Sequence, residues 1–486
     1  MLPNLTPTLQ SAVPMATYWQ MRAEPQPADY RPDTKINEIA QFLADPVEAA
    51  QFPAHQLRFR NTRWDKAVGL GELSDTEWIA HFGKFESLPD NLPKPLALRY
   101  HGHQFRTYNP EIGDGRGFLF AQMRDGAGRL LDCGTKGSGT TPYSRSGDGR
   151  LTLKGAVREI LATQMLEAQG VYTSKTLSVV ETGEELWRND EPSPTRSAVM
   201  VRLSHGHIRI GSFQRLTALE EDAALAQLAD YCLAAYPGPP PPEDAPGRDE
   251  PAVILLHQVA ERLADLAASY MVAGFVHGVL NTDNMNISGE SFDYGPWRWL
   301  PQWEPQFTAA YFDQTGLYAF GRQPEAIRWN LGQLAIALRP LAESEPLIAA
   351  LDRFGPLYGQ AMMRRFCWRL GVEQCGDEED AALVGAAELA MRESKTGPDA
   401  FFHRHRGGRD AEGPLAQALE GYQSTDSEHP YWSQDLPASM LIDEVETIWD
   451  AIAERDDWEP LQARVAAIRD MGDALGDAPE PAGHRG

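Results

Sequence analysis

The 486-residue chain is poor in cysteine and in long apolar stretches. Its four cysteines are scattered and lack the CxxC or Cys/His spacing of a metal site. Such sparse cysteine fits a reducing compartment, so we expect a cytoplasmic protein. The first residues lack the basic start and apolar run of a secretory signal. No apolar run is long enough to span a membrane.

Basic residues are also scarce, because 44 Lys and Arg stand against 69 Asp and Glu and give a net charge of −25. A surface this negative repels the phosphates of nucleic acids and anionic membranes, so we expect neither as a partner. Small anions can bind only where Lys and Arg are locally concentrated. The chain is 42% hydrophobic, enough to bury a sizeable core. Its length suits about two to three domains or one large two-lobed unit.

Local patterns change along the chain from short strands to long helices. Short apolar runs predict strands at 117–122, 129–133, 176–182 and 197–203. Residues 124–128 are the expected hairpin turn between the first two. Helical spacing of apolar residues predicts one helical stretch near 35–50, a helix over 151–169 and a longer helix from Val253 to Gly274. From about residue 325 onward, most of the chain has the pattern of amphipathic helix.

The Pro-rich loop 237–246 indicates a lobe boundary or a surface excursion between the two kinds of segment. A β-rich, glycine-rich half followed by a helical half is the order of a kinase's small and large lobes. We therefore predict an α+β, two-lobed protein-kinase-like fold with N- and C-terminal extensions. The predicted parts are an N-terminal extension at 1–90, an N lobe at 91–250, a C lobe at 251–370 and a helical C-terminal extension at 371–486.

Residues 277–295 carry the strongest functional signal. The run His277-Gly-Val-Leu-Asn-Thr-Asp-Asn284, followed by Asp293-Tyr-Gly295, is typical of the catalytic and metal-binding loops of a kinase-like fold. The position of the usual phosphoryl-transfer base holds Val279, which cannot accept a proton. Ordinary phosphorylation is therefore not the expected chemistry.

Three side chains of this stretch could still bind a metal ion or accept a proton in a reaction of a nucleotide. Asn284 and Asp293 are oxygen ligands nine residues apart that straddle an expected short hairpin at Met285–Phe292, and Mg²⁺ prefers such sparse oxygen ligation together with nucleotide phosphates. Asp283 is adjacent and could act as a base. The plainer alternative is a polar turn that caps a short hairpin at Met285–Phe292.

A lysine and a glutamate precede this stretch in the order that kinases use. Lys136 follows a predicted strand, and Glu159 lies 23 residues later on the predicted helix 151–169. Such a pair places the lysine on the nucleotide phosphates. The surroundings of Lys136 do not satisfy the P-loop pattern. The alternative is two unrelated surface charges.

Two glycine-rich segments could lie over phosphates. Gly113-Asp-Gly-Arg-Gly117 would let backbone N–H groups approach them, with Arg116 as a fixed cation, although an ordinary β-turn has the same composition. Residues 138–149 end in Asp148-Gly149 and form either a loop over the nucleotide or a flexible linker.

Arg202 and Arg209 could clamp phosphates with planar donors, or they could be a surface pair over apolar residues. The chain also has two His-x-His pairs, at His101/His103 and His205/His207. No carboxylate or cysteine completes a site at either pair, so we do not predict zinc.

Taken together, these motifs resemble the selenoprotein O (SelO/YdiU) family. The resemblance covers roughly residues 60–345, and its motifs are long and ordered. They are Tyr100-His-Gly-His-Gln-Phe105, Ile112-Gly-Asp-Gly-Arg116, Asp132–Arg145, Gly147-Asp-Gly149, Lys154–Glu159, His277–Asn284, Phe292–Pro296 and Tyr318–Pro324.

The resemblance implies a kinase fold that holds ATP in a reversed orientation and transfers AMP to Ser, Thr or Tyr hydroxyls of protein substrates. The residues it implies as nucleotide contacts are Gly113, Gly115, Arg116, Lys136, Asp148, Gly149, Arg202 and Arg209. It further implies Glu159 as the partner of the lysine and Asp283 as the proton acceptor. Asn284 and Asp293 would hold Mg²⁺ or Mn²⁺.

The chain departs from the family pattern at Arg106, where the family usually has glycine, and its region near His429-Pro430 matches only faintly. The tail 479–486 has no cysteine or selenocysteine, so the redox element of many members is absent there. Three other functions stay open at this point: a conventional kinase, a transferase that uses UTP with Mn²⁺, and a silent pseudokinase scaffold that binds nucleotide.

Overall fold

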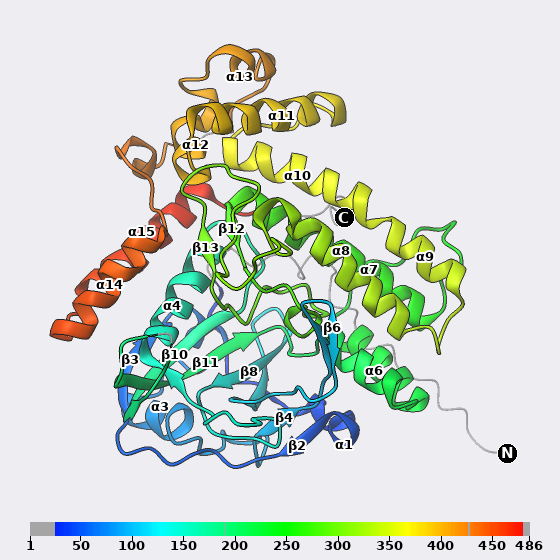
Figure 1. Cartoon of the computed structure of the whole chain (residues 1–486), viewed down its shortest axis with the longest axis vertical. Helices are drawn as coiled ribbons and strands as arrows, with labels where there is room; N and C mark the ends of the chain where they lie inside the picture. The colour runs from blue at the N-terminus through cyan, green and yellow to red at the C-terminus, as the bar shows by residue number, and fades with distance from the viewer. Residues whose placement is uncertain (1–24, 190, 426–427, 480–486) are drawn as a thin grey trace.

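A large antiparallel sheet is built mostly from the first half of the chain (Figure 1). The computed structural model describes residues 25–189, 191–425 and 428–479. The N-terminal stretch that we expected not to be a signal, and nearly all of the cysteine-free tail, lie outside the described residues. The main path of the sheet runs β2 (Ala44–Pro46), β4 (Leu96–Leu98), β7 (Leu119–Arg124), β8 (Leu130–Lys136), β11 (Thr195–Ser204), β10 (Lys175–Leu186) and β3 (Gln56–Arg60).

Six further strands within the described ranges are short. β1 (Pro32–Asp33) pairs with β7, and β9 (Leu151–Thr152) pairs with β11. Two small hairpin-like pairs lie outside the large sheet, and they are β5 (Gly102–Gln104) with β6 (Thr107–Asn109) and β12 (Phe275–Val276) with β13 (Arg298–Trp299). The segment 1–90, expected as an extension, thus supplies β1, β2 and β3 to the sheet.

Helices dominate the rest of the chain. Those before residue 250 are α1 (Ala40–Leu43), α2 (Trp64–Ala67), α3 (Asp75–Phe82), α4 (Leu153–Ala168), α5 (Ile210–Ala218) and α6 (Asp222–Ala235). Those after it are α7 (Pro251–Ala273), α8 (Gln323–Ala337), α9 (Ser344–Asp352), α10 (Phe354–Leu370), α11 (Asp377–Ser394), α12 (Pro398–Arg404), α13 (Gly413–Ala418), α14 (Ile442–Arg455) and α15 (Glu459–Leu475). Sheet and helices together confirm the α+β class.

The predicted elements compare well with those observed, with two corrections. The hairpin of β7 and β8, the strands β10 and β11, and the helices α4 and α7 are confirmed. The helix expected near 35–50 is only a 3-10 turn and the short α1, because the chain then extends into β2 to pair with β4. The hairpin expected at 285–292 is wrong. The backbone at its start hydrogen-bonds to residues 208–210, and the backbone near its end hydrogen-bonds to residues 172–174. Both ends therefore pair with segments far away in the sequence and not with each other.

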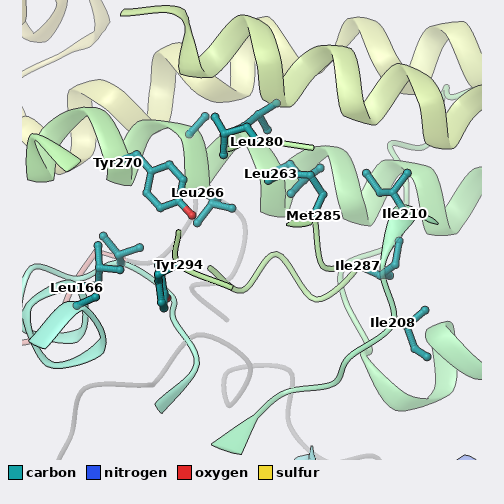
Figure 2. Packing of buried hydrophobic residues seen from close by; sticks show 14 of the residues in the cluster. Leu166, Ile208, Ile210, Leu263, Leu266, Tyr270, Leu280, Met285, Ile287 and Tyr294 are labelled. Carbon is teal, nitrogen blue, oxygen red and sulfur yellow. The ribbon is translucent and has the colours of Figure 1, made fainter. Parts of the chain in front are cut away.

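Helix α7 is the centre of the core and fixes the catalytic-loop motif. It starts with Pro251 at its first turn and ends at Gly274, whose φ of 65° is a left-handed C-cap that glycine adopts without strain. Nearly all of its side chains are buried. Figure 2 shows Leu263 of α7 beside Leu280 and Met285, which flank the motif residues 281–284. Apolar burial on both sides of this polar segment therefore holds it in place.

The last two helices lie against α4 (Figure 1). Lys154 of α4 pairs with Glu446 of α14 at 2.6 Å, and Arg469 of α15 donates to Gln164 of α4 at 2.8 Å. The C-terminal helices thus support the helix that carries Glu159. Among the described residues, no helix is long and apolar enough to cross a membrane.

Candidate functional site

A cavity of about 740 Å³ opens beside β8 and β11. Ten of the twelve predicted site residues line it: Gly113, Gly115, Arg116, Lys136, Asp148, Gly149, Arg202, Arg209, Asn284 and Asp293. Glu159 and Asp283 are not among its lining residues. Glu159 nevertheless pairs with Lys136, and Asp283 is adjacent in sequence to Asn284. Both Lys136 and Asn284 line the cavity. Segments separated by up to 180 residues in the sequence therefore meet around one space.

Lys136, at the end of β8, pairs with Glu159 of α4. Both side chains are buried, and the lysine Nζ lies 3.9 Å from Oδ1 of Asp293. Burial lowers the pKa of Lys136, and the charge of Glu159 opposes this shift. The arrangement is the strand-lysine and helix-glutamate pair expected from the sequence, so the surface-charge alternative is wrong.

Asp293 is surrounded by the two predicted arginines. Its Oδ1 lies 2.5 Å from Arg202 and its Oδ2 lies 3.3 Å from Arg209. Burial alone would raise the pKa of Asp293, but Arg202, Lys136 and Arg209 hold it well below its usual range. The carboxylate is therefore ionised. Its backbone φ of 56° lies in the left-handed region, a strained conformation of the kind that recurs at functional sites.

The two glycine-rich segments pack on one another at the rim of the cavity. The ring of Tyr143 lies flat against Gly113, where a Cβ atom would come within 2.4 Å of it. The Ser144 hydroxyl donates to the Gly115 carbonyl at 2.5 Å. Gly149 has a φ of 71° and would place a Cβ 2.3 Å from Gly139, so only glycine fits there. The loop 138–149 is therefore pinned over the 113–117 segment, which disfavours the flexible-linker alternative.

Asp148 marks the outer end of this loop. Its carboxylate accepts from Arg188 at 2.9 Å and from the Arg150 backbone N–H at 3.0 Å. Burial would raise the pKa of Asp148, but these two donors keep it lowered. Arg150 and Arg188 also line the cavity, and the sequence analysis missed both of them.

The catalytic-loop motif lies at the opposite wall. Val279 lines the cavity, and its carbonyl accepts from Nδ2 of Asn284 at 2.9 Å. That bond fixes the amide, so Oδ1 of Asn284 is the atom left to bind a cation. Oδ1 of the neighbouring Asp283 is buried without a hydrogen-bond partner. Burial raises the pKa of Asp283 to about 6, only partly offset by its own backbone N–H and by Arg209.

The β5–β6 hairpin covers this motif. The His103 N–H donates to the Thr282 hydroxyl at 2.7 Å, and the Phe105 N–H donates to the Asn281 side chain at 3.0 Å. Asn281 also accepts from the Tyr318 hydroxyl at 2.7 Å. The loop that contains Asp283 is thus held from both sides, which fixes the position of this side chain.

The oxygen donors fit a hard divalent ion. Asp293 is ionised and Asn284 offers an amide oxygen, which are ligand types that Mg²⁺ and Mn²⁺ accept. In the described part of the chain, no group of three or more His, Cys, Asp or Glu side chains could hold a metal by itself. An ion at these two residues would therefore need further ligands from outside the protein's own side chains to complete its coordination.

Several residues of the site gave no clear signal in the sequence. Asp114 lies 3.2 Å from Arg209, whose guanidinium also sits 4.4 Å from the ring centre of Tyr100. His207 contacts Arg202. All three occur inside motifs of the sequence, but their role depends on long-range packing. The His-x-His pairs do not converge, and their members contact Tyr108, Gln214, Tyr172 and Asp132.

Comparison with known proteins agrees with this geometry. The family model described as "Protein adenylyltransferase SelO" matches residues 28–412. The chain is 43% identical to a protein nucleotidyltransferase YdiU of Synechococcus elongatus, over 90% of this chain and 94% of the relative. It is 42% identical to a YdiU protein of Synechocystis (89% and 97%) and 36% identical to one of Vibrio vulnificus (70% and 69%). The chain therefore belongs to the selenoprotein O (SelO/YdiU) family of protein nucleotidyltransferases.

Proposed function

We propose that the protein is a Mg²⁺-dependent protein adenylyltransferase that moves AMP from ATP to Ser, Thr or Tyr hydroxyls of protein substrates. One observation carries the proposal. The cavity joins three buried cations to a catalytic loop in which valine takes the place of the kinase base. Family membership supports a nucleotidyl transfer, and the valine argues against ordinary phosphorylation.

We also propose that the chain forms a kinase-like unit of two lobes with an extension at each end. Residues 91–250 would form the small lobe, with most strands of the large sheet, Lys136 and Glu159, and residues 251–370 would form the large lobe of a kinase-like unit. Residues 1–90 and 371–486 would be extensions that brace these lobes, as α14 and α15 do on α4.

The cations supply the phosphate site. Lys136, Arg202 and Arg209 are buried, and their charges are now balanced by Glu159 and Asp293. Planar guanidinium groups match phosphate oxygens well, and charge-assisted bonds of this kind are strong. Phosphates would share these N–H groups with Asp293 and release part of that carboxylate for the metal. The backbone of Gly113 and Gly115 would approach the phosphates from the rim.

Asn284 and Asp293 would hold Mg²⁺, or Mn²⁺ in its place. When bound, the ion supplies positive charge that neutralises the phosphates. Asp283 is the one carboxylate of the 277–284 motif, and we assign it the proton of the acceptor hydroxyl. The hydroxyl oxygen forms a bond to the α-phosphorus, its proton passes to Asp283, and the bond to the β-phosphate oxygen breaks so that pyrophosphate leaves. Atoms and charges balance in this step.

Labelled ATP tests the proposal directly. The protein is incubated with acceptor proteins, Mg²⁺ and ATP labelled at the α- or at the γ-phosphate. We expect α-label to become protein-bound and mass spectrometry to find added AMP. Stable γ-label without α-label would assign a kinase, and binding of ATP without either label would assign a silent scaffold. A parallel series with labelled UTP and Mn²⁺ would assign a uridylyltransferase if it were the faster reaction.

A further inference from the structure

His207 lies between a buried carboxylate and an arginine of the cavity. Its Nδ1 is 3.3 Å from Oδ2 of Asp132, and its Nε2 is 3.1 Å from Nε of Arg202. An arginine Nε can only donate, so Nε2 of His207 must accept and the ring proton must be on Nδ1, facing Asp132. Burial lowers the pKa of His207, which agrees with a neutral ring, although the bond to Asp132 opposes that shift. The contacts therefore select one tautomer.

The sheet makes room for this ring. Gly134 of β8 is paired with Arg202 of β11, and a Cβ atom on Gly134 would lie 2.3 Å from Nε2 of His207. Any other residue at this position would displace the imidazole. The absence of a side chain at Gly134 of β8 thus leaves room for the imidazole of His207.

The contacts continue on both sides of the histidine. Gln122 donates to the second oxygen of Asp132 at 2.7 Å, and Arg202 donates to Asp293 at 2.5 Å. The result is a buried series from Gln122 through Asp132, His207 and Arg202 to the proposed metal ligand. Arginine has five N–H donors, and two are used in these bonds, which leaves three for other acceptors.

We infer that His207 is a positioning residue for nucleotidyl transfer, because it holds Arg202 at Nε and so directs the remaining N–H groups at the phosphates. Asp132 keeps the tautomer that makes this possible. A guanidinium held at Nε and at one Nη cannot turn about its last bonds, so its free donors keep one direction. The inference rests on the proposed function, since it names what aligns one of the phosphate contacts.

The competing explanation is structural: His207 would serve only to satisfy buried Asp132. Two substitutions make opposite predictions. His207→Gln keeps an acceptor near the position of Nε2, for Arg202. His207→Asn keeps a donor near the position of Nδ1, for Asp132, and loses the acceptor. A positioning role favours the Gln variant, and a structural role favours the Asn variant.

The readouts are binding of Mg²⁺ with a non-hydrolysable ATP analogue, kcat and KM for α-label transfer, and the melting temperature. We expect His207→Asn to lower kcat/KM about 10–100-fold, the effect of losing one hydrogen bond to a charged group, while His207→Gln stays within a few-fold of wild type. Adding His207→Asn to an Arg202→Gln protein should have almost no further effect. Better transfer by the Asn variant than by the Gln variant, or an undiminished effect in the Arg202→Gln protein, would overturn the inference.

Arg202→Lys keeps the test decisive if the histidine variants do not fold. It preserves the charge and removes the Nε contact with His207. We expect it to lose transfer as His207→Asn does, and full transfer by Arg202→Lys would overturn the inference. If the wild type transfers no α-label but analogue binding still separates the Gln and Asn variants, the proposed transfer fails, and the alignment of Arg202 by His207 for phosphate binding stands.

Discussion

Replacing Asp283 by asparagine tests the assignment of the base. The change keeps the size of the side chain and removes only its capacity to take a proton. Asn284 and Asp293 remain, so nucleotide and metal binding should persist. We expect AMP transfer to fall about 10²–10⁴-fold, the usual effect of losing a general base.

The environment of Asp283 adds a pH dependence to this test. Burial raises its pKa to about 6, so the carboxyl holds its proton below that pH and cannot accept another. About nine-tenths of the group is ionised at pH 7 and about one-tenth at pH 5. Wild-type kcat should therefore fall roughly tenfold between pH 7 and pH 5 with an inflection near 6. The Asp283→Asn variant should lack this inflection.

The assay follows transfer of α-label from pH 5 to pH 8, with saturating Mg-ATP and with analogue binding measured in parallel. Asp249→Asn is the matched control, because it makes the same change at a fully exposed acid in the loop before α7. It should leave both rate and pH profile unchanged. Wild-type transfer by Asp283→Asn, or an inflection near 6 that survives in it, would refute the assignment.

Four further perturbations address the other parts of the site. Asp293→Ala should abolish transfer and make Mg²⁺ binding in the presence of nucleotide undetectable by calorimetry, and normal activity of the wild type in excess chelator would contradict the metal assignment. Arg209→Ala should weaken transition-state binding by about 2–4 kcal/mol in kcat/KM. Lys136→Ala should do the same and also lower the free energy of unfolding by about 3–5 kcal/mol, because it leaves buried Glu159 unpaired; an unchanged melting temperature would show that the pair is not buried in solution. Val279→Asp should not create efficient transfer of γ-label, and robust kinase activity would overturn the proposed orientation of ATP.

Local patterns were sufficient for the elements that depend on neighbours in the sequence. The β7–β8 hairpin follows from two apolar runs around a glycine turn, and α7 follows from its periodicity and its glycine cap. The order of Lys136, Glu159 and the 277–295 motif was also readable, because Lys136 ends β8, Glu159 lies on α4 and the motif follows α7. The predicted cations then do meet around one cavity.

Elements that depend on distant partners could not be predicted in this way. β1 and β2 have only two or three residues each, and their strand character comes from β7 and β4. The 285–292 segment alternates like a hairpin, but its edges bond to two other segments instead. The role of His207 depends on a gap above Gly134 in another strand. Tertiary pairing decides all of these, and a single sequence does not display it.

The charges of the site explain how so acidic a chain can hold a nucleotide. A net charge of −25 repels polyanions, but salt largely screens that repulsion at separations beyond a Debye length of about 8–10 Å. Inside the cavity, Lys136, Arg202 and Arg209 gather around one carboxylate, Asp293, which keeps three buried cations from destabilising the fold. The phosphates of ATP would bring more negative charge than Asp293 supplies, so the cations would gain partners while Asp293 becomes available to a metal. In this proposal the same carboxylate would serve stability and catalysis, which is why its removal should affect both.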